Sequence, residues 1–214
     1  MAQPLLLLAH VNRALAHLRE PALASLDEEG SRARRMRVWL DDDHLVAWLQ
    51  RSFEFGFCKA ECIPPREQPD ARGRLKKRYR LPPDCLHVRG VEGLTVDDWD
   101  IASATLDPVA PDDQPALRVL VCNIDAPLVS YSRLITNPAG WDAMFGEVFA
   151  LELAIRAAPS FGIGNDRIDQ LESQRNAVVA PARRRSAQER APQAFPTRGV
   201  PYLAARFTGF RRRF

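Results

Sequence analysis

The chain has 214 residues, of which 46% are hydrophobic and 27% charged, as in folded proteins rather than disordered or membrane-spanning ones. The apolar run at residues 5–8 is too short for a secretory signal, and no stretch approaches the roughly 18 apolar residues of a membrane span, so we expect no membrane insertion. The net charge of +3 is unevenly distributed: residues 181–214 hold nine arginines and one glutamate, whereas residues 1–180 hold 21 basic and 26 acidic residues, a net charge of −5.

Two helices are predicted in the first quarter of the chain. Apolar residues recur at helical spacing until Pro21 ends the pattern, which predicts a helix over residues 3–19. Ser25 and Glu28 form a capping-box pattern, which predicts a second, longer helix over residues 27–52. The apolar stripe of that second helix consists of Met36, Leu40, His44 and Trp48.

The region over residues 53–131 has the signals of a sheet. Phe53, Phe55 and Phe57 alternate with other residues, as in a half-buried strand. Residues 64–78 are rich in Pro, Arg and Lys and are interpreted as an exposed loop. Further extended segments, separated by Pro and Asp turns, are expected over residues 79–88, 101–106, 117–124 and 128–131.

Two more helices are predicted after the strands. Residues 142–158 carry apolar side chains on two adjacent helical stripes, so this helix should be buried on a wide face. Residues 165–180 carry only a narrow apolar stripe, formed by Ile168, Leu171 and Val178. The other faces of this fourth helix are free for solvent or for a neighbouring subunit.

The predicted fold is α+β and mainly α. It consists of a four-helix body with a small, mostly antiparallel sheet inserted between the second and third helices. Residues 1–180 are expected to form this domain, and residues 181–214 a basic C-terminal tail that contains Pro and aromatic residues.

No group of side chains indicates an enzyme, a cofactor or a metal site. Asp41, Asp42, Asp43 and His44 are consecutive on a predicted helix, where they point about 100° apart and cannot converge on one ion. The four cysteines lack paired metal-site spacing and are interpreted as core residues. Because neither a catalytic triad nor a carboxylate pair can be singled out, we expect no enzymatic activity.

Four arginines crowd the first half of the second predicted helix. Arg32, Arg34, Arg35 and Arg37 cannot all point one way, so several are expected to meet acidic groups on an adjacent subunit or on the fourth helix. We interpret these four residues as a subunit interface.

Two other basic segments are residues 66–80 and the C-terminal tail. Each could be a solubilising segment, could contact phosphate, or could dock on an acidic protein surface. Aromatic rings are interleaved with the tail arginines, which is unusual in a purely solvating segment, so we expect the tail to become ordered on a partner. The expected docking residues are the apolar anchors Tyr202, Phe207 and Phe210 and the charged Arg211, Arg212 and Arg213.

The order of these features resembles the tail tubular protein A, or head-to-tail adaptor, family of short-tailed bacteriophages. The resemblance covers roughly residues 5–190 and rests on the order and spacing of the motifs. The matching segments are Ser25–Glu28, Trp48–Phe55, Tyr79–Val88 and Trp141–Ala154, the last of which leads into the final long helix.

The resemblance implies a structural protein of the virion that is assembled in the host cytoplasm. It would form a homo-oligomeric ring, usually of twelve copies, between the portal protein and a tail or nozzle protein. Double-stranded DNA would pass through the lumen, and the ring would support head–tail joining, DNA retention and ejection. An acidic body suits such a channel, because every phosphate that a basic wall neutralises adds a salt-dependent hold on the duplex.

The alternative interpretation is a DNA-binding or packaging accessory protein. In that case the basic tail would be an arm that contacts phosphate. A steeply salt-dependent affinity of the monomer for free duplex would favour it, whereas assembly with a portal ring that survives high salt would favour the adaptor.

Overall fold

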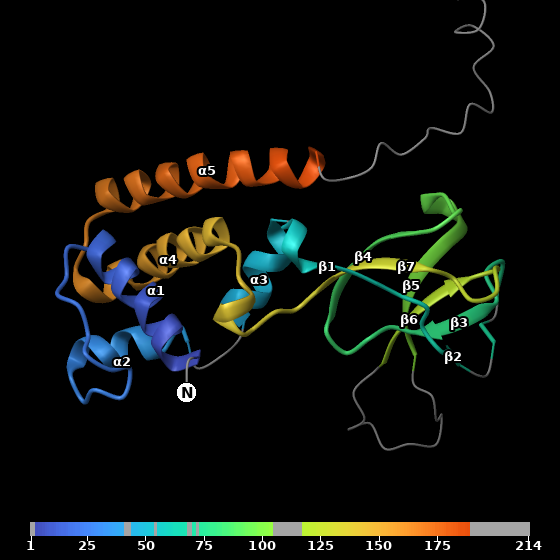
Figure 1. Cartoon of the computed structure of the whole chain (residues 1–214), viewed down its shortest axis with the longest axis horizontal. Coiled ribbons are helices and arrows are strands. Elements are labelled where there is room, and N and C mark those ends of the chain that lie inside the picture. The colour runs from blue at the N-terminus through green and yellow to red at the C-terminus, as the bar shows by residue number, and fades with distance from the viewer. Residues whose placement is uncertain are drawn as a thin grey trace, which may run out of the picture.

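A computed structural model describes residues 3–40, 44–53, 55–67, 70–71, 73–104 and 117–188. The helices gather in one part of the molecule and the strands in another (Figure 1). The helices are α1 (Gln3–His17), α2 (Ser31–Arg37), α3 (His44–Ser52), α4 (Ala143–Ala157) and α5 (Asn165–Gln188). The strands are β1 (Lys59–Cys62), β2 (Arg66–Glu67), β3 (Lys77–Arg80), β4 (Cys85–Val91), β5 (Trp99–Ala104), β6 (Leu117–Cys122) and β7 (Val129–Arg133).

Helix α4 is the centre of the helical part and contacts each of the other four helices or the turns next to them. The Asp142 carboxylate caps its first turn by accepting the Met144 N–H at 2.7 Å. Its large side chains are fully buried, and burial of each contributes roughly 1.5–3 kcal/mol. They are Phe145, Phe149, Leu151 and Leu153. The chain then turns at Gly162, whose φ of 72° is left-handed, and returns along α4 as α5 (Figure 1).

The seven described strands form two antiparallel sheets. One has the order β1-β7-β4 and the other the order β2-β3-β6-β5. Residues on alternate positions of both sheets share one core, which includes Tyr79, Val91, Leu120, Val129 and Tyr131. Arg118 of β6 joins the sheets, because its guanidinium donates to the carbonyl oxygens of Cys85 and Leu86 on β4, at 2.8 and 3.0 Å.

Aromatic rings pack where the chain passes between the helical part and the sheets. Phe55, which follows α3, lies 5.0 Å from Phe145 of α4, and Trp141 lies 5.0 Å from the same ring. Gln50 is fully buried in this region, and its amide makes two hydrogen bonds with the backbone of Ile135, of 2.8 and 2.9 Å. The sheets are therefore fixed to the helical part where the chain leaves it and where it returns.

The prediction of a four-helix body with one small sheet was wrong. The described residues contain five helices and two antiparallel sheets, which is an α+β fold. The predicted helix over residues 27–52 is divided into α2 and α3, because α2 closes in a tight turn in which Trp39 and Leu40 donate backbone N–H groups to residues three positions earlier. Ser25 caps a turn at Asp27 instead of a helix, and α2 begins after Gly30.

Three further boundaries differ from the prediction. Phe55 and Phe57 do not lie on a strand: a 3-10 turn over Gly56–Cys58 directs their rings into the aromatic junction, and β1 begins at Lys59. The predicted exposed loop over residues 64–78 contains β2, which pairs with β3. Helix α5 begins where predicted but continues through Pro181, which does not end it. Helices α1 and α4 lie where the apolar spacing predicted them.

Candidate protein-interaction surfaces

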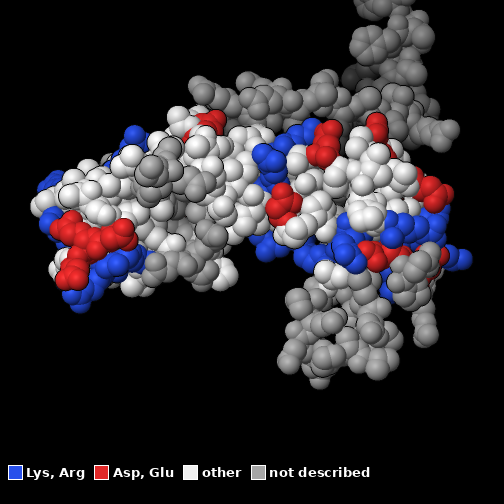
Figure 2. Space-filling model, turned by 60° about the horizontal axis from the view of Figure 1, so that its bottom comes forward, with Lys and Arg blue, Asp and Glu red and all other residues white. Residues whose placement is uncertain are grey.

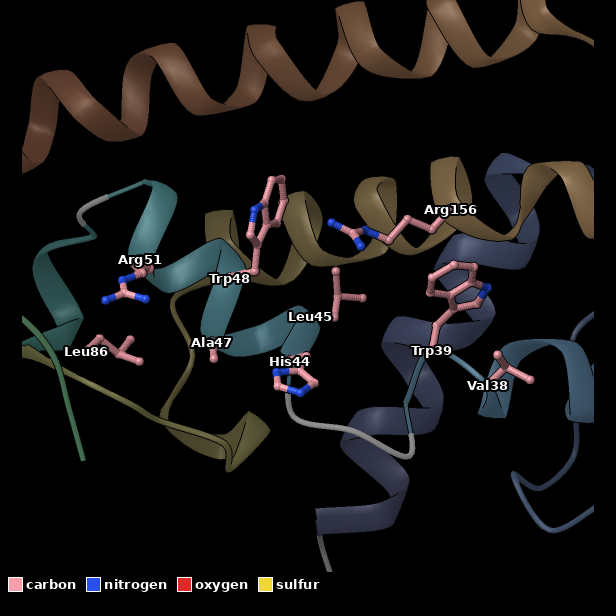
Figure 3. Close-up of a pocket in the computed structure, with 9 residues that line it drawn as sticks. All are labelled: Val38, Trp39, His44, Leu45, Ala47, Trp48, Arg51, Leu86 and Arg156. Carbon is pink, nitrogen blue, oxygen red and sulfur yellow. The ribbon is translucent and has the colours of Figure 1, made fainter. Parts of the chain in front are cut away.

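A groove of about 630 Å³ lies between the end of α2, helix α3, and neighbouring parts of β4 and α4. Figure 3 shows its labelled residues extending from Arg51 and Leu86 at one end to Trp39 and Val38 at the other. Much of the apolar surface is open to solvent, since Val38 is 68% and Trp48 41% exposed. The lining residues are Val38, Trp39, His44, Leu45, Ala47, Trp48, Arg51, Leu86 and Arg156.

The groove carries positive charge. The Arg156 guanidinium lies 4.7 Å from the centre of the Trp48 ring, within the range of a cation–π contact (Figure 3). Arg51 is exposed and makes no hydrogen bond or ion pair with another described residue. Among the described residues that line the groove, none is acidic. Its surface therefore combines two indole rings with two guanidinium groups.

Arg156 is held in place by a buried acid. The Glu152 carboxylate accepts from Arg156 at 2.9 Å and from Arg175 of α5 at 2.6 Å, and its side chain is only 5% exposed. Because both carboxylate oxygens have a cationic partner, the charge is buried at a tolerable cost. The same carboxylate therefore links α4 to α5 and positions one edge of the groove.

The four α2 arginines predicted as an interface are directed to different places. Arg32, Arg34 and Arg37 donate to backbone carbonyl oxygens of the segment that precedes α2, at Pro21, Glu29 and Glu28. The Arg35 guanidinium lies 5.1 Å from the centre of the Phe161 ring, next to the start of α5. Arg34 and Arg35 remain exposed, and their contact with an adjacent subunit stays a prediction.

Charged side chains gather at two places on the face shown in Figure 2. One is the end of the molecule formed by α2, and the other is the surface of the sheets; the described surface between them is largely uncharged. Over the sheets, acidic residues neutralise much of the basic β2–β3 segment. The ion pairs there are Arg66–Asp70 at 3.1 Å, Lys77–Asp125 at 2.7 Å and Arg80–Glu67 at 2.6 Å.

A second hollow, of about 580 Å³, lies on the outer face of the β2-β3-β6-β5 sheet. Its floor includes Val121, which the strand register places between Arg78 of β3 and Asp100 of β5. The Nε of Arg78 is buried and has no hydrogen-bond partner. A basic and an acidic residue thus lie on opposite sides of an apolar floor.

Burial shifts the pKa values of the described cysteines and of His10. No group of three or more potential metal ligands occurs among the described residues. The four cysteines are free thiols, and burial raises the pKa of Cys58 to about 12 and that of Cys85 to about 11. Burial, followed by the charge of Arg13, lowers the pKa of His10, whose ring lies 5.4 Å from that of Trp141.

The tail residues predicted to dock on a portal lie outside the described residues: Tyr202, Phe207, Phe210, Arg211, Arg212 and Arg213. The groove was missed by sequence reasoning. Trp39 and Trp48 are nine positions apart, which would place them on opposite faces of one continuous helix. Only the break between α2 and α3 brings both rings to one surface. The aspartates at positions 41–43, directly before α3, are a sequence signal for that break, because Asp is favoured at the start of a helix.

None of the helices in the described part of the chain is both long and apolar enough to span a membrane. Comparison of the chain with protein families and with curated proteins found no match.

Proposed function

We propose that this chain is a structural subunit of a homo-oligomeric ring of the head-to-tail adaptor type, with twelve copies between the portal and a tail or nozzle protein of a short-tailed bacteriophage. The ring would be a virion component, assembled in the host cytoplasm, through which double-stranded DNA passes. The proposal rests on the sequence resemblance and on the surfaces described above. Of the four matching segments, Ser25–Glu28 does not begin a helix and Trp48–Phe55 does not lead directly into a strand, whereas Trp141–Ala154 does contain the start of a long buried helix.

The observation that carries the proposal is the exposure of α5. This 24-residue helix packs on α4 through a narrow side that includes Leu171 and Val179. Over residues 165–181, where side-chain burial is described, most polar positions are exposed to solvent. Its first half exposes the carboxylates of Asp166, Asp169 and Glu172. Such a helix gains stability when a neighbouring subunit covers it.

Charge also favours contact between different surfaces of identical subunits. The acidic half of α5 is complementary to the exposed guanidinium groups of Arg34 and Arg35 on α2. A contact that joins two different surfaces is heterologous, and repetition of such a contact closes a ring when the rotation allows it.

The first test is the mass of the purified full chain. Mass photometry should detect a species near twelve times the monomer mass of 24.1 kDa, and negative-stain images should show rings. A strictly monomeric chain at all concentrations, with and without a portal protein, would contradict the proposal.

The second test is charge reversal on α2. The double variant Arg34→Glu/Arg35→Glu should weaken ring formation more than it changes the melting temperature of the subunit. Lys76→Glu, an exposed basic residue in the β-region, is the matched control and should leave the ring intact. Equal losses of assembly and of thermal stability in the α2 variant would argue against an intersubunit role.

The third test concerns the tail. Deletion of residues 191–214 should leave a folded body that no longer joins portal rings stably, because the anchors Tyr202, Phe207 and Phe210 are removed with their arginine neighbours. Full occupancy of portal rings by the truncated chain in high salt would show that the tail is not the docking element.

The runner-up, a DNA-binding or packaging accessory protein, is favoured only by the basic tail. In the other basic segment, residues 66–80, the side chains of Arg66, Lys77 and Arg80 are paired with nearby carboxylates. Affinity of the monomer for free duplex, measured over a series of salt concentrations, separates the two functions: a steep decrease with salt indicates phosphate contacts and supports the accessory protein.

A further inference from the structure

We propose that the groove lined by Trp39, Trp48 and Arg51 binds a short segment of a partner protein that carries a large apolar side chain next to an acidic one. This inference does not depend on ring assembly. It rests on the shape, exposure and charge of the groove.

The apolar part of the groove fits an aromatic or large aliphatic side chain. Leu45 is buried beneath the surface, whereas the indole of Trp48 and the side chain of Val38 remain exposed beside it. Tryptophan is enriched among the residues that dominate binding energy at protein interfaces, because its large rigid ring buries apolar area at a low entropic cost. An occupant would remove this surface from water.

The charge of the groove selects an acidic neighbour for that apolar side chain. Arg51 is exposed and has no hydrogen-bond or ion-pair partner among the described residues, and guanidinium groups bind carboxylates with two parallel hydrogen bonds. Arg156 adds a second positive charge, which Glu152 fixes over the Trp48 ring. No described residue of the lining supplies a competing carboxylate.

The positions of these groups define the geometry of recognition. Arg51 and Leu86 lie at one end of the groove and Trp39 at the other, with Trp48, Leu45 and Arg156 between them (Figure 3). The apolar side chain of the partner would lie against the exposed part of the Trp48 indole, and its acidic residue at the Arg51 end. The arrangement is rigid at Arg156, because its ion pair with a buried carboxylate fixes the guanidinium before binding.

A basic occupant is disfavoured by the same residues. The C-terminal tail of a second copy has aromatic rings but also nine arginines from residue 181 onward, and these would be repelled by Arg51 and Arg156.

Selection from a random peptide library on the immobilised full chain measures that preference. The sequences recovered should combine Leu, Phe or Trp with Asp or Glu. Selection on Arg51→Glu should shift the recovered charge from acidic to basic, and Trp48→Ala should abolish recovery of these peptides. Lys76→Glu is the control, because Lys76 is also an exposed basic residue and does not line the groove. It should leave the selected sequences unchanged.

The outcomes decide between occupants. Acidic, apolar peptides that change with both groove variants support the proposal, provided that circular dichroism shows the variants to be folded. Recovery of arginine-rich aromatic peptides would assign the groove to the tail of a second copy and overturn the proposal. Absence of any enriched peptide, or enrichment that the groove variants do not alter, would overturn it as well.

Discussion

The helical part and the two-sheet part of this chain are stabilised in different ways. In the helical part, a single helix, α4, is buried on almost all sides, and the residues packed on it come from every other helix. In the two-sheet part, a small core with two tyrosines and two cysteines lies between strands of two to seven residues, and ion pairs cover the surface of one sheet. The contrast predicts that the stability of the helical part depends mainly on apolar packing. The stability of the sheets should depend more on the hydrogen bonds between strands and on surface charge.

The largest expected effect on stability comes from removing an aromatic ring of α4 that packs beside α1. Phe149→Ala should lower the free energy of unfolding by about 3–5 kcal/mol, because the ring is almost completely buried and its removal leaves a cavity. Chemical denaturation followed by circular dichroism measures this change. A soluble variant with unchanged unfolding would contradict the assignment of α4 as the centre of the core.

The next effect compares two glutamates on α4 that each contact two basic side chains. Glu152→Ala should cost about 1–3 kcal/mol, because it leaves Arg156 and Arg175 without their carboxylate at a buried position. Glu147→Ala, whose side chain is 31% exposed and pairs with Arg13 and His17, should cost about 0–1 kcal/mol. Equal costs in the two variants would show that burial does not distinguish these ion-pair groups.

A third comparison uses one glycine from each part. A Cβ at Gly146 of α4 would overlap the His10 ring of α1, so Gly146→Ala should destabilise the protein by about 1–2 kcal/mol despite the better helix propensity of Ala. A Cβ at Gly90 of β4 meets nothing, so Gly90→Ala should change stability by less than about 0.5 kcal/mol. A larger loss at Gly90 than at Gly146 would contradict the close packing of α1 on α4.

The smallest expected effect is a difference in the pH at which the two parts lose stability. Burial lowers the pKa of His10 from its ordinary value of 6.5, so the unfolded chain takes up this proton first. The stability of the helical part should therefore decrease as pH falls below 6.5 and level off below the pKa of the folded state. In His10→Gln, the free energy of unfolding should change less with pH below 6.5 than in the unchanged protein.

The sheet part should respond in a more acidic range. A hydrogen bond from Lys77, together with its charge, lowers the pKa of Asp125 from its ordinary value of 3.8. The stability that this pair contributes is present above pH 3.8 and is lost as pH falls through the lower folded-state pKa. Asp125→Asn should remove the loss of stability in the acid range and leave the loss of stability near pH 6 intact. If Asp125→Asn also removed the loss near pH 6, that loss would have to be assigned to the sheets.

Periodicity predicted the parts of the fold that are determined locally. The apolar spacing of α1 and α4 located both helices, and the turn residues between β5, β6 and β7 separated these strands within a few residues. The break between α2 and α3 was not predicted, since residues 27–52 keep an apolar spacing compatible with one helix. The division of the strands into two sheets depends on pairing between residues far apart in the chain, such as Lys59 with Ser132, which local patterns do not specify.

The candidate site was predicted less well than the fold. The interface arginines of α2 were recognised as a group, but their hydrogen bonds to the preceding backbone depend on the position of the segment over residues 21–29. The groove escaped prediction because its lining comes from α2, α3, β4 and α4 together. Surfaces of this kind follow from tertiary packing, and a single sequence contains no periodic signal for them.

The side-chain amide of Gln50 holds together the two points at which the two-sheet part joins the helices. Its two hydrogen bonds to Ile135 connect positions 85 residues apart, at the exit from α3 and shortly before the return to α4. The whole two-sheet part lies between these two positions and so has the geometry of an insertion with closely spaced ends. We therefore expect that a different β-module with the same end-to-end separation can replace residues 59–133, provided that Phe55 and Phe57 keep their packing against α4. The loop-closure cost depends only weakly on the length of the inserted chain.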